Sequence, residues 1–134
     1  MNLAPDQSKK VEVTCSNPWN PTSIEVTIGE HYAFKVLNYK EMRDAWIEAT
    51  PDGLVKVPPH LQPRMVRRCL RCPTAEWYAL TGTIGHSDDH AFLIGSERTV
   101  EMKQTGEIYL FVNDVHRFYW NNRGCLRVLI RRCR

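Results

Sequence analysis

The sequence has no apolar run of about 18 residues or more, so no membrane span is expected. The opening residues, MNLAPDQSKKVEVT, lack the apolar segment of a secretory signal. The localisation therefore stays open between the cytoplasm and export by a route that needs no signal peptide. The cysteines number five, and an odd number argues against a complete disulfide framework.

The charge balance is also modest, with a formal net charge of +3. Arginines cluster at Arg64, Arg67, Arg68 and Arg71, but no nucleic-acid-binding motif accompanies them. We expect them on a solvated face, and nucleic acid is not an expected partner.

Catalytic motifs are missing as well, including G-x-S-x-G, H-E-x-x-H and a glycine-rich phosphate loop. The segment GHSDDH at residues 85–90 could bind a metal or relay protons, although its position between two strand signals favours a plain polar turn. Cys69 and Cys72 have zinc-like spacing, but no second pair supplies further ligands. We therefore expect a protein that is not an enzyme.

What the sequence does contain is a series of short runs in which apolar and polar residues alternate. Glycine and proline separate these runs, and none shows a sustained helical period. This predicts an all-β fold, an antiparallel β-sandwich, with a flexible segment at 1–9 and one domain over 10–134. A turn or brief helix is expected over 38–49 and long loops over 38–72. The predicted strands are 11–14, 23–28, 31–37, 76–84, 90–94, 98–103, 107–113 and 125–131.

The segment GEIYLFVNDVHRFYWNNRGCLRVLI, residues 106–130, is the most informative. Two alternating strands flank a polar loop that carries Asp114 and, seven and eight residues later, Asn121 and Asn122. Such a loop brings several hard oxygens together, as calcium requires. Alternatively, these residues merely support turns, because Asp and Asn tolerate left-handed backbone geometry. The residues expected to fill the core are Ile108, Leu110, Val112, Leu126, Val128 and Ile130.

This loop and its strands resemble the C-terminal signature of the bacterial galactophilic lectins. Other segments resemble the same family in the right order: Pro18-Trp19 and the strands after it, Trp46 with the turn at 51–53, and the hairpin at 77–95. The resemblance runs from about residue 10 to residue 131. It implies a β-sandwich with galactose-binding-like architecture that binds Ca2+ and, through the ion, two hydroxyls of a sugar.

Matched residue by residue, the resemblance implies that the side chains of Asp114, Asn121 and Asn122 hold the calcium. It also implies a backbone carbonyl at Phe118 and a second one from a distant loop, for which we predict Tyr39. A single formal charge among these ligands predicts a modest affinity. Asp52, Asp88 or Asp89 could add a carboxylate.

The resemblance further implies that His60 and Gln62 contact the sugar. We also predict ligand contacts for Val115 and for Trp120, which lies in the loop next to Asn121 and is expected to be exposed. We expect Trp77, within an alternating strand, to pack in the core. Calcium-dependent binding of a carbohydrate, galactose-type or another glycan, is thus the expected function, and a homo-oligomer stays open. The alternative is a calcium-stabilised accessory or targeting module of a larger hydrolase or effector system, without a sugar site.

Overall fold

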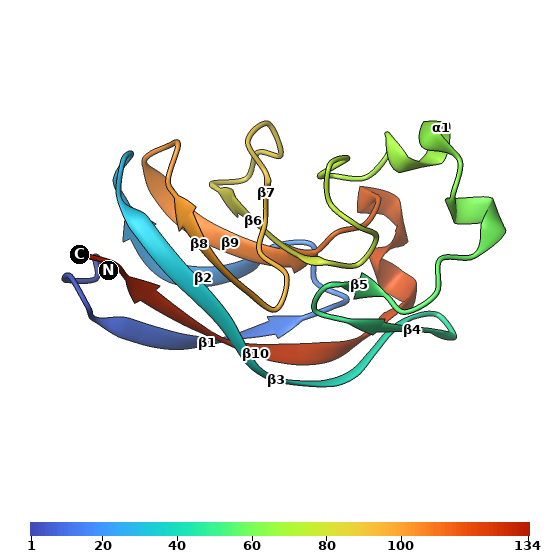
Figure 1. Ribbon diagram of the computed structural model, residues 1–134, viewed down its shortest axis with the longest axis horizontal. Coiled ribbons are helices and arrows are strands. Elements are labelled where there is room, and N and C mark those ends of the chain that lie inside the picture. Colours follow the sequence, from blue (N-terminus) through green and yellow to red (C-terminus); the bar gives the residue numbers. More distant parts are fainter.

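The computed structural model describes residues 1–134 and contains two antiparallel sheets that face each other (Figure 1). The predicted β-sandwich is therefore confirmed. One sheet has the order β1-β10-β3-β4-β5, with β8 also paired to β3, and the other has the order β2-β9-β6-β7. No helix has the length and apolar character needed to cross a membrane.

The strands of the larger sheet are β1 (Ser8–Thr14), β10 (Asn122–Arg132), β3 (His31–Asp44), β4 (Ile47–Thr50), β5 (Gly53–Leu54) and β8 (Glu97–Glu101). Those of the smaller sheet are β2 (Asn20–Val26), β9 (Gly106–Val112), β6 (Leu80–Ile84) and β7 (Phe92–Leu93). Three short helices lie in the connections: η1 (Pro59–Leu61), α1 (Arg64–Arg67) and η2 (His116–Asn121).

The core lies between the sheets, where alternate side chains of β9 and β10 are fully buried. Burial of a large aliphatic or aromatic side chain contributes about 1.5–3 kcal/mol, so this layer stabilises the pairing of the two sheets. The predicted alternation is confirmed for all six residues, each of which is 0% exposed: Ile108, Leu110, Val112, Leu126, Val128 and Ile130.

The region from Asn38 to Asp44 differs from the prediction, because β3 continues through it without a turn or helix. Its polar side chains are mostly exposed, yet its backbone stays paired with β10, where Asp44 lies opposite Asn122. Backbone pairing thus decides the conformation of a segment whose side chains carry no strand pattern. The chain then turns tightly at Ala45, which has a positive φ of 56°, into β4.

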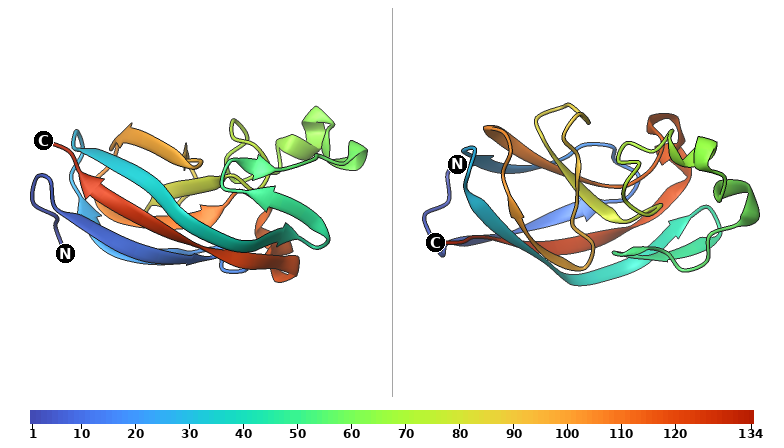
Figure 2. Two further views of the ribbon diagram at one scale, coloured as in Figure 1. Left: turned by 60° about the horizontal axis from the view of Figure 1, so that its bottom comes forward. Right: turned by 45° about the horizontal axis from the view of Figure 1, so that its top comes forward.

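The N-terminal segment, which the sequence predicts to be flexible, packs against the sandwich. Leu3 is only 1% exposed, and the N-terminal amine of Met1 donates a hydrogen bond to the Ser23 carbonyl at 3.0 Å. Both termini lie at the same end of the molecule, and α1 lies near the other end (Figures 1 and 2). The five cysteines are all free thiols.

Candidate functional site

The loop that follows β9 begins with a fully buried amide, Asn113. Its Nδ2 donates to the carbonyls of Cys72, Ala75 and Glu76 at 2.9, 3.2 and 3.1 Å. Its Oδ1 accepts a hydrogen bond from the Cys72 N–H at 3.0 Å. Because every polar atom of this side chain has a partner, Asn113 fixes the loop to the 72–76 segment and offers nothing to a ligand.

The next polar side chains of the loop, Asp114, Asn121 and Asn122, are in the opposite situation. Asp114 is 1% exposed and Asn122 is 4% exposed. Asp114 Oδ2, Asn121 Oδ1 and Asn122 Oδ1 are all buried, and none has a hydrogen-bond partner within the chain. A buried acceptor without a partner costs about 1–3 kcal/mol. The three side chains named by the sequence motif are thus the ones whose oxygens are left free.

In two of these side chains, the remaining polar atom makes a hydrogen bond that holds the side chain in place. Asp114 Oδ1 accepts a hydrogen bond from the Val115 N–H at 2.7 Å, and Asn122 Nδ2 donates to the Cys15 carbonyl at 3.3 Å. Asp114 and Asn122 are therefore each held by one side-chain atom, while Asp114 Oδ2 and Asn122 Oδ1 are free. This is the donor set that a hard cation such as Ca2+ prefers, since it binds carboxylate and amide oxygens.

Burial dominates the electrostatics of Asp114. Burial raises the pKa of its carboxyl to about 7, against the opposing effects of the Val115 N–H and the Asn122 amide. The nearby Asp44 carboxylate raises this pKa further. A cation beside Asp114 would favour its charged form and reverse the effect of burial.

The structure places the two predicted carbonyl ligands differently. Phe118 lies in η2 at a kink with φ −111° and ψ 16°, within the loop itself. Tyr39 pairs with Leu126, four residues along β10 from Asn122. The residues that approach the loop from β3 are instead Asp44, opposite Asn122, and Ala45, whose N–H donates to the Asn121 carbonyl at 3.0 Å.

An open cavity of about 610 Å³ lies beside the loop, and both Asp114 and Asn121 line it. The other walls come from the β3–β4 turn, from the segment around η1 and α1, and from Trp77 of the loop before β6. Most of its lining is apolar, as is usual for ligand-binding cavities. The apolar and aromatic residues include Trp46, Ile47, Leu61, Met65, Val66, Trp77 and Phe118.

Of the predicted sugar contacts, His60 and Val115 line this cavity. Gln62 does not, and its Nε2 donates instead to the Val57 carbonyl at 3.0 Å. Trp120 is 79% exposed and lies outside the cavity wall. Trp77 is 4% exposed, as a residue packed in the core should be, although one edge of it reaches the cavity.

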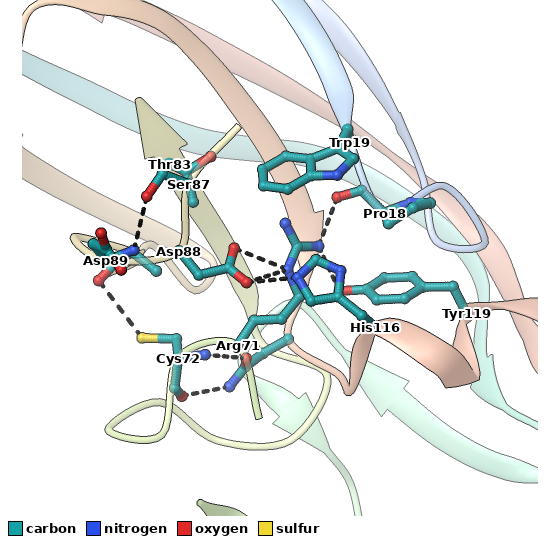
Figure 3. Close-up of polar contacts among 12 residues, drawn as sticks. Pro18, Trp19, Arg71, Cys72, Thr83, Ser87, Asp88, Asp89, His116 and Tyr119 are labelled. Atoms are coloured by element: carbon teal, nitrogen blue, oxygen red, sulfur yellow. Dashed lines mark hydrogen bonds and ion pairs between the residues drawn. The ribbon is translucent and has the colours of Figure 1, made fainter. Parts of the chain in front are cut away.

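A second polar cluster lies around Arg71, which holds the loop from another direction (Figure 3). The Arg71 side chain is 1% exposed, and its guanidinium carbon lies 3.3 Å from the ring centre of Phe111 and 4.2 Å from that of Trp19. Its Nη1 donates to the Pro18 carbonyl at 2.6 Å and to the Tyr119 hydroxyl at 2.9 Å. These contacts join η2 to the loop before β2.

Asp88 completes this cluster. Arg71 Nε lies 3.1 Å from Asp88 Oδ1, and His116 Nε2 lies 2.6 Å from Asp88 Oδ2. The GHSDDH segment therefore has a structural contact that the sequence pattern did not predict. The prediction that Arg71 lies on a solvated face is wrong, because two aromatic rings and a carboxylate enclose it.

The three acidic residues predicted as further ligands lie elsewhere. Asp88 pairs with Arg71 and His116, and Asp52 Oδ1 accepts the Ser96 N–H at 2.8 Å. Asp89 is exposed in the β6–β7 loop. Asp44 is a residue of the site that the sequence pattern did not predict. The only signal for it was its position in the polar stretch before Trp46, which does not reveal its strand register.

No protein-family model and no curated protein matches this chain. Among solved structures, the chain is similar to the EclA N-terminal domain, a PllA-like lectin, with a TM-score of 0.66 and 16% sequence identity. The similarity covers 92% of this chain and 94% of that one. At this identity the comparison shows a shared fold, and the chain therefore has a lectin-like β-sandwich.

Proposed function

We propose that this protein is a calcium-dependent carbohydrate-binding module. The observation that carries the proposal is the set of three buried, unpartnered oxygens on one loop, from Asp114, Asn121 and Asn122. Their residue types and spacing are those of the calcium loop in the lectins that the sequence resembles. The lectin-like fold, shared with a PllA-like lectin over most of both chains, supports the same function.

In this proposal the three side chains and the Phe118 carbonyl hold the ion. We leave out Tyr39, because the β3–β10 register places it away from Asn122. A bound calcium ion would supply coordination positions for two hydroxyls of a sugar, as the resemblance implies. Hydrogen bonds from Asn113 and Arg71 tie the loop to neighbouring segments, which would help to hold these oxygens in position for an ion.

The cavity beside Asp114 supports a sugar rather than a purely structural ion. Its aromatic walls, Trp46, Trp77 and Phe118, suit the apolar C–H face of a sugar ring, and His60 adds a polar group. A ring held there would have hydroxyls on one edge near the loop oxygens. The alternative, a calcium-stabilised accessory module, would not need such an open cavity.

A glycan array probed with and without a chelator tests this function. Calcium-dependent signals for galactose-type or other glycans, lost with the chelator and with Asp114→Asn, are expected. Asp89→Asn is the matched control, because it removes the same charge from an exposed loop. Calcium binding without any glycan signal would support the accessory-module alternative, and glycan signals that persist in chelator would contradict the proposal.

A further inference from the structure

Asp44 is a second carboxylate beside the loop, and strand pairing fixes its place. It is the last residue of β3 and lies directly opposite Asn122 of β10. Residues directly opposite each other on antiparallel strands project to the same face of the sheet, with Cβ atoms about 4.5–5.5 Å apart. The Asp44 side chain therefore lies next to that of Asn122, whose Oδ1 is buried and unpartnered.

The turn after Asp44 holds this arrangement. Ala45 has a left-handed backbone conformation, and its N–H donates to the Asn121 carbonyl at 3.0 Å. The end of β3 is thus bonded to the loop at the two consecutive asparagines. Asp44, Asp114 and Asn121 all line the same cavity.

The Asp44 carboxylate itself has no hydrogen-bond or ion-pair partner in the chain, although it is only partly exposed. Asp44 and Asp114 line the same cavity, and Asp114 is only 1% exposed. Two carboxylates close together and shielded from water are unfavourable unless a cation compensates their charge.

We propose that Asp44 supplies a second carboxylate to the cation site of Asp114, Asn121 and Asn122. The proposal rests on the proposed calcium site and changes its character. With Asp44 the site carries two negative charges, which balance a divalent cation, where the loop motif alone provides one. Because ligand charge tunes calcium affinity, Asp44 makes the site tighter than the motif predicts.

Titration of the full chain with Ca2+, and with Tb3+ as a luminescent substitute, tests this proposal. Trp46 and Trp77 line the cavity and are placed to sensitise terbium emission. For Asp44→Asn we expect the calcium affinity to fall by about tenfold or more, since the size is kept and the charge is lost.

Glu48→Gln is the matched control. Glu48 lies on β4 next to Ile47, the residue opposite Asp44, and therefore points to the other face of the sheet. Its affinity should stay within about twofold of wild type, because an exposed charge is largely screened. If Asp44→Asn and Glu48→Gln bind calcium equally, the role of Asp44 is overturned while the calcium site stands. If wild type binds neither ion, the proposed calcium site itself fails.

Thermal unfolding in chelator shows whether Asp44 binds the ion or instead stabilises the fold. Asp44→Asn should melt at the same temperature as wild type or higher, because it removes a repulsion. Asp44→Ser provides a second variant with the same expectation. If both variants melt well below wild type in chelator, or fail to fold, Asp44 has a structural role and the proposal is wrong.

Discussion

Two groups of polar side chains meet at the loop between β9 and β10, and they differ in how many of their polar atoms form hydrogen bonds within the protein. Around Asn113 and Arg71, nearly every polar atom bonds to the protein, with one guanidinium nitrogen, Nη2, as the exception. At Asp114, Asn121 and Asn122, each side chain keeps one buried oxygen without a partner. Native proteins leave few such groups, so each one has a physical reason.

The first group, around Asn113 and Arg71, thus forms a framework that holds the loop, and the second group, Asp114, Asn121 and Asn122, forms the candidate binding site. Asn113 and Asn122 are both buried asparagines of the same segment, yet one makes four hydrogen bonds and the other makes one. Burial alone therefore does not identify the site. The free oxygens do, because they keep their capacity for something outside the chain.

The largest expected effect comes from breaking the framework at Arg71. Arg71→Met keeps much of the volume but leaves the Pro18 carbonyl without its donor and the Asp88 carboxylate with His116 as its remaining partner. Removing one member of a buried ion pair costs about 3–5 kcal/mol, and since Asp88 is partly exposed we expect roughly 3 kcal/mol. Urea unfolding in chelator measures this.

Arg68→Met is the control for this variant, because Arg68 is exposed on the same segment and should lose no more than about 0.5 kcal/mol. Similar losses for the two variants would show that the Arg71 cluster does not stabilise the fold.

Replacing Asn113 or Asn122 tests the same difference, with a smaller expected loss of unfolding free energy. Asn113→Ala leaves the Cys72 N–H unpaired and removes one of the hydrogen bonds to each of three carbonyls, which should cost about 2–3 kcal/mol in unfolding free energy. Asn122→Ala removes a single bond and should cost about 1 kcal/mol or less in chelator. In calcium the order of sensitivity changes, since Asn122→Ala loses the ion-dependent part of the stability. Equal losses in chelator would contradict the division into framework and site.

The third prediction concerns pH in the absence of calcium. Burial raises the pKa of Asp114 to about 7, above its unfolded value near 4, so between these values the folded state holds a proton that the unfolded state has released. The unfolding free energy contributed by this group therefore falls as pH rises, by up to about 1.4 kcal/mol per pH unit.

Chelated wild type should lose stability relative to Asp114→Asn between pH 5 and pH 7, as measured by urea unfolding at each pH. The variant serves as the reference because histidines and other carboxyls titrate in both proteins. If the two proteins had parallel pH profiles of unfolding free energy, burial would not raise the pKa of Asp114.

Features that depend on residues near one another in the chain could be predicted from the sequence. Ile108 and Leu126 could be placed in the core, because strict alternation reports the buried face of a strand. The spacing of Asp114, Asn121 and Asn122 predicts a calcium loop, and in the structure each of these side chains has a buried oxygen with no partner in the chain. These features depend on residues close together in the chain.

Features that depend on distant contacts were not predictable in the same way. Arg71 belongs to a run of arginines that is typical of a solvated surface. Only its contacts with Trp19 and Phe111, each about forty or more residues away, show that it is buried. Asp44 lies in a polar stretch without a strand pattern, and its register against β10 brings it to Asn122. Local periodicity carries no information about such pairings.

Calcium titration by calorimetry, on wild type and Asp114→Asn after exhaustive chelation, tests the cation site most directly. Asp114 supplies the only formal charge among the three loop side chains, so the variant should lose most of the affinity while keeping its fold. Wild type should bind one calcium per chain, and at a hundredfold excess over Kd the ion should add about 2.7 kcal/mol to the unfolding free energy. No binding to wild type, or equal binding to both proteins, would contradict the assignment of these oxygens to a cation.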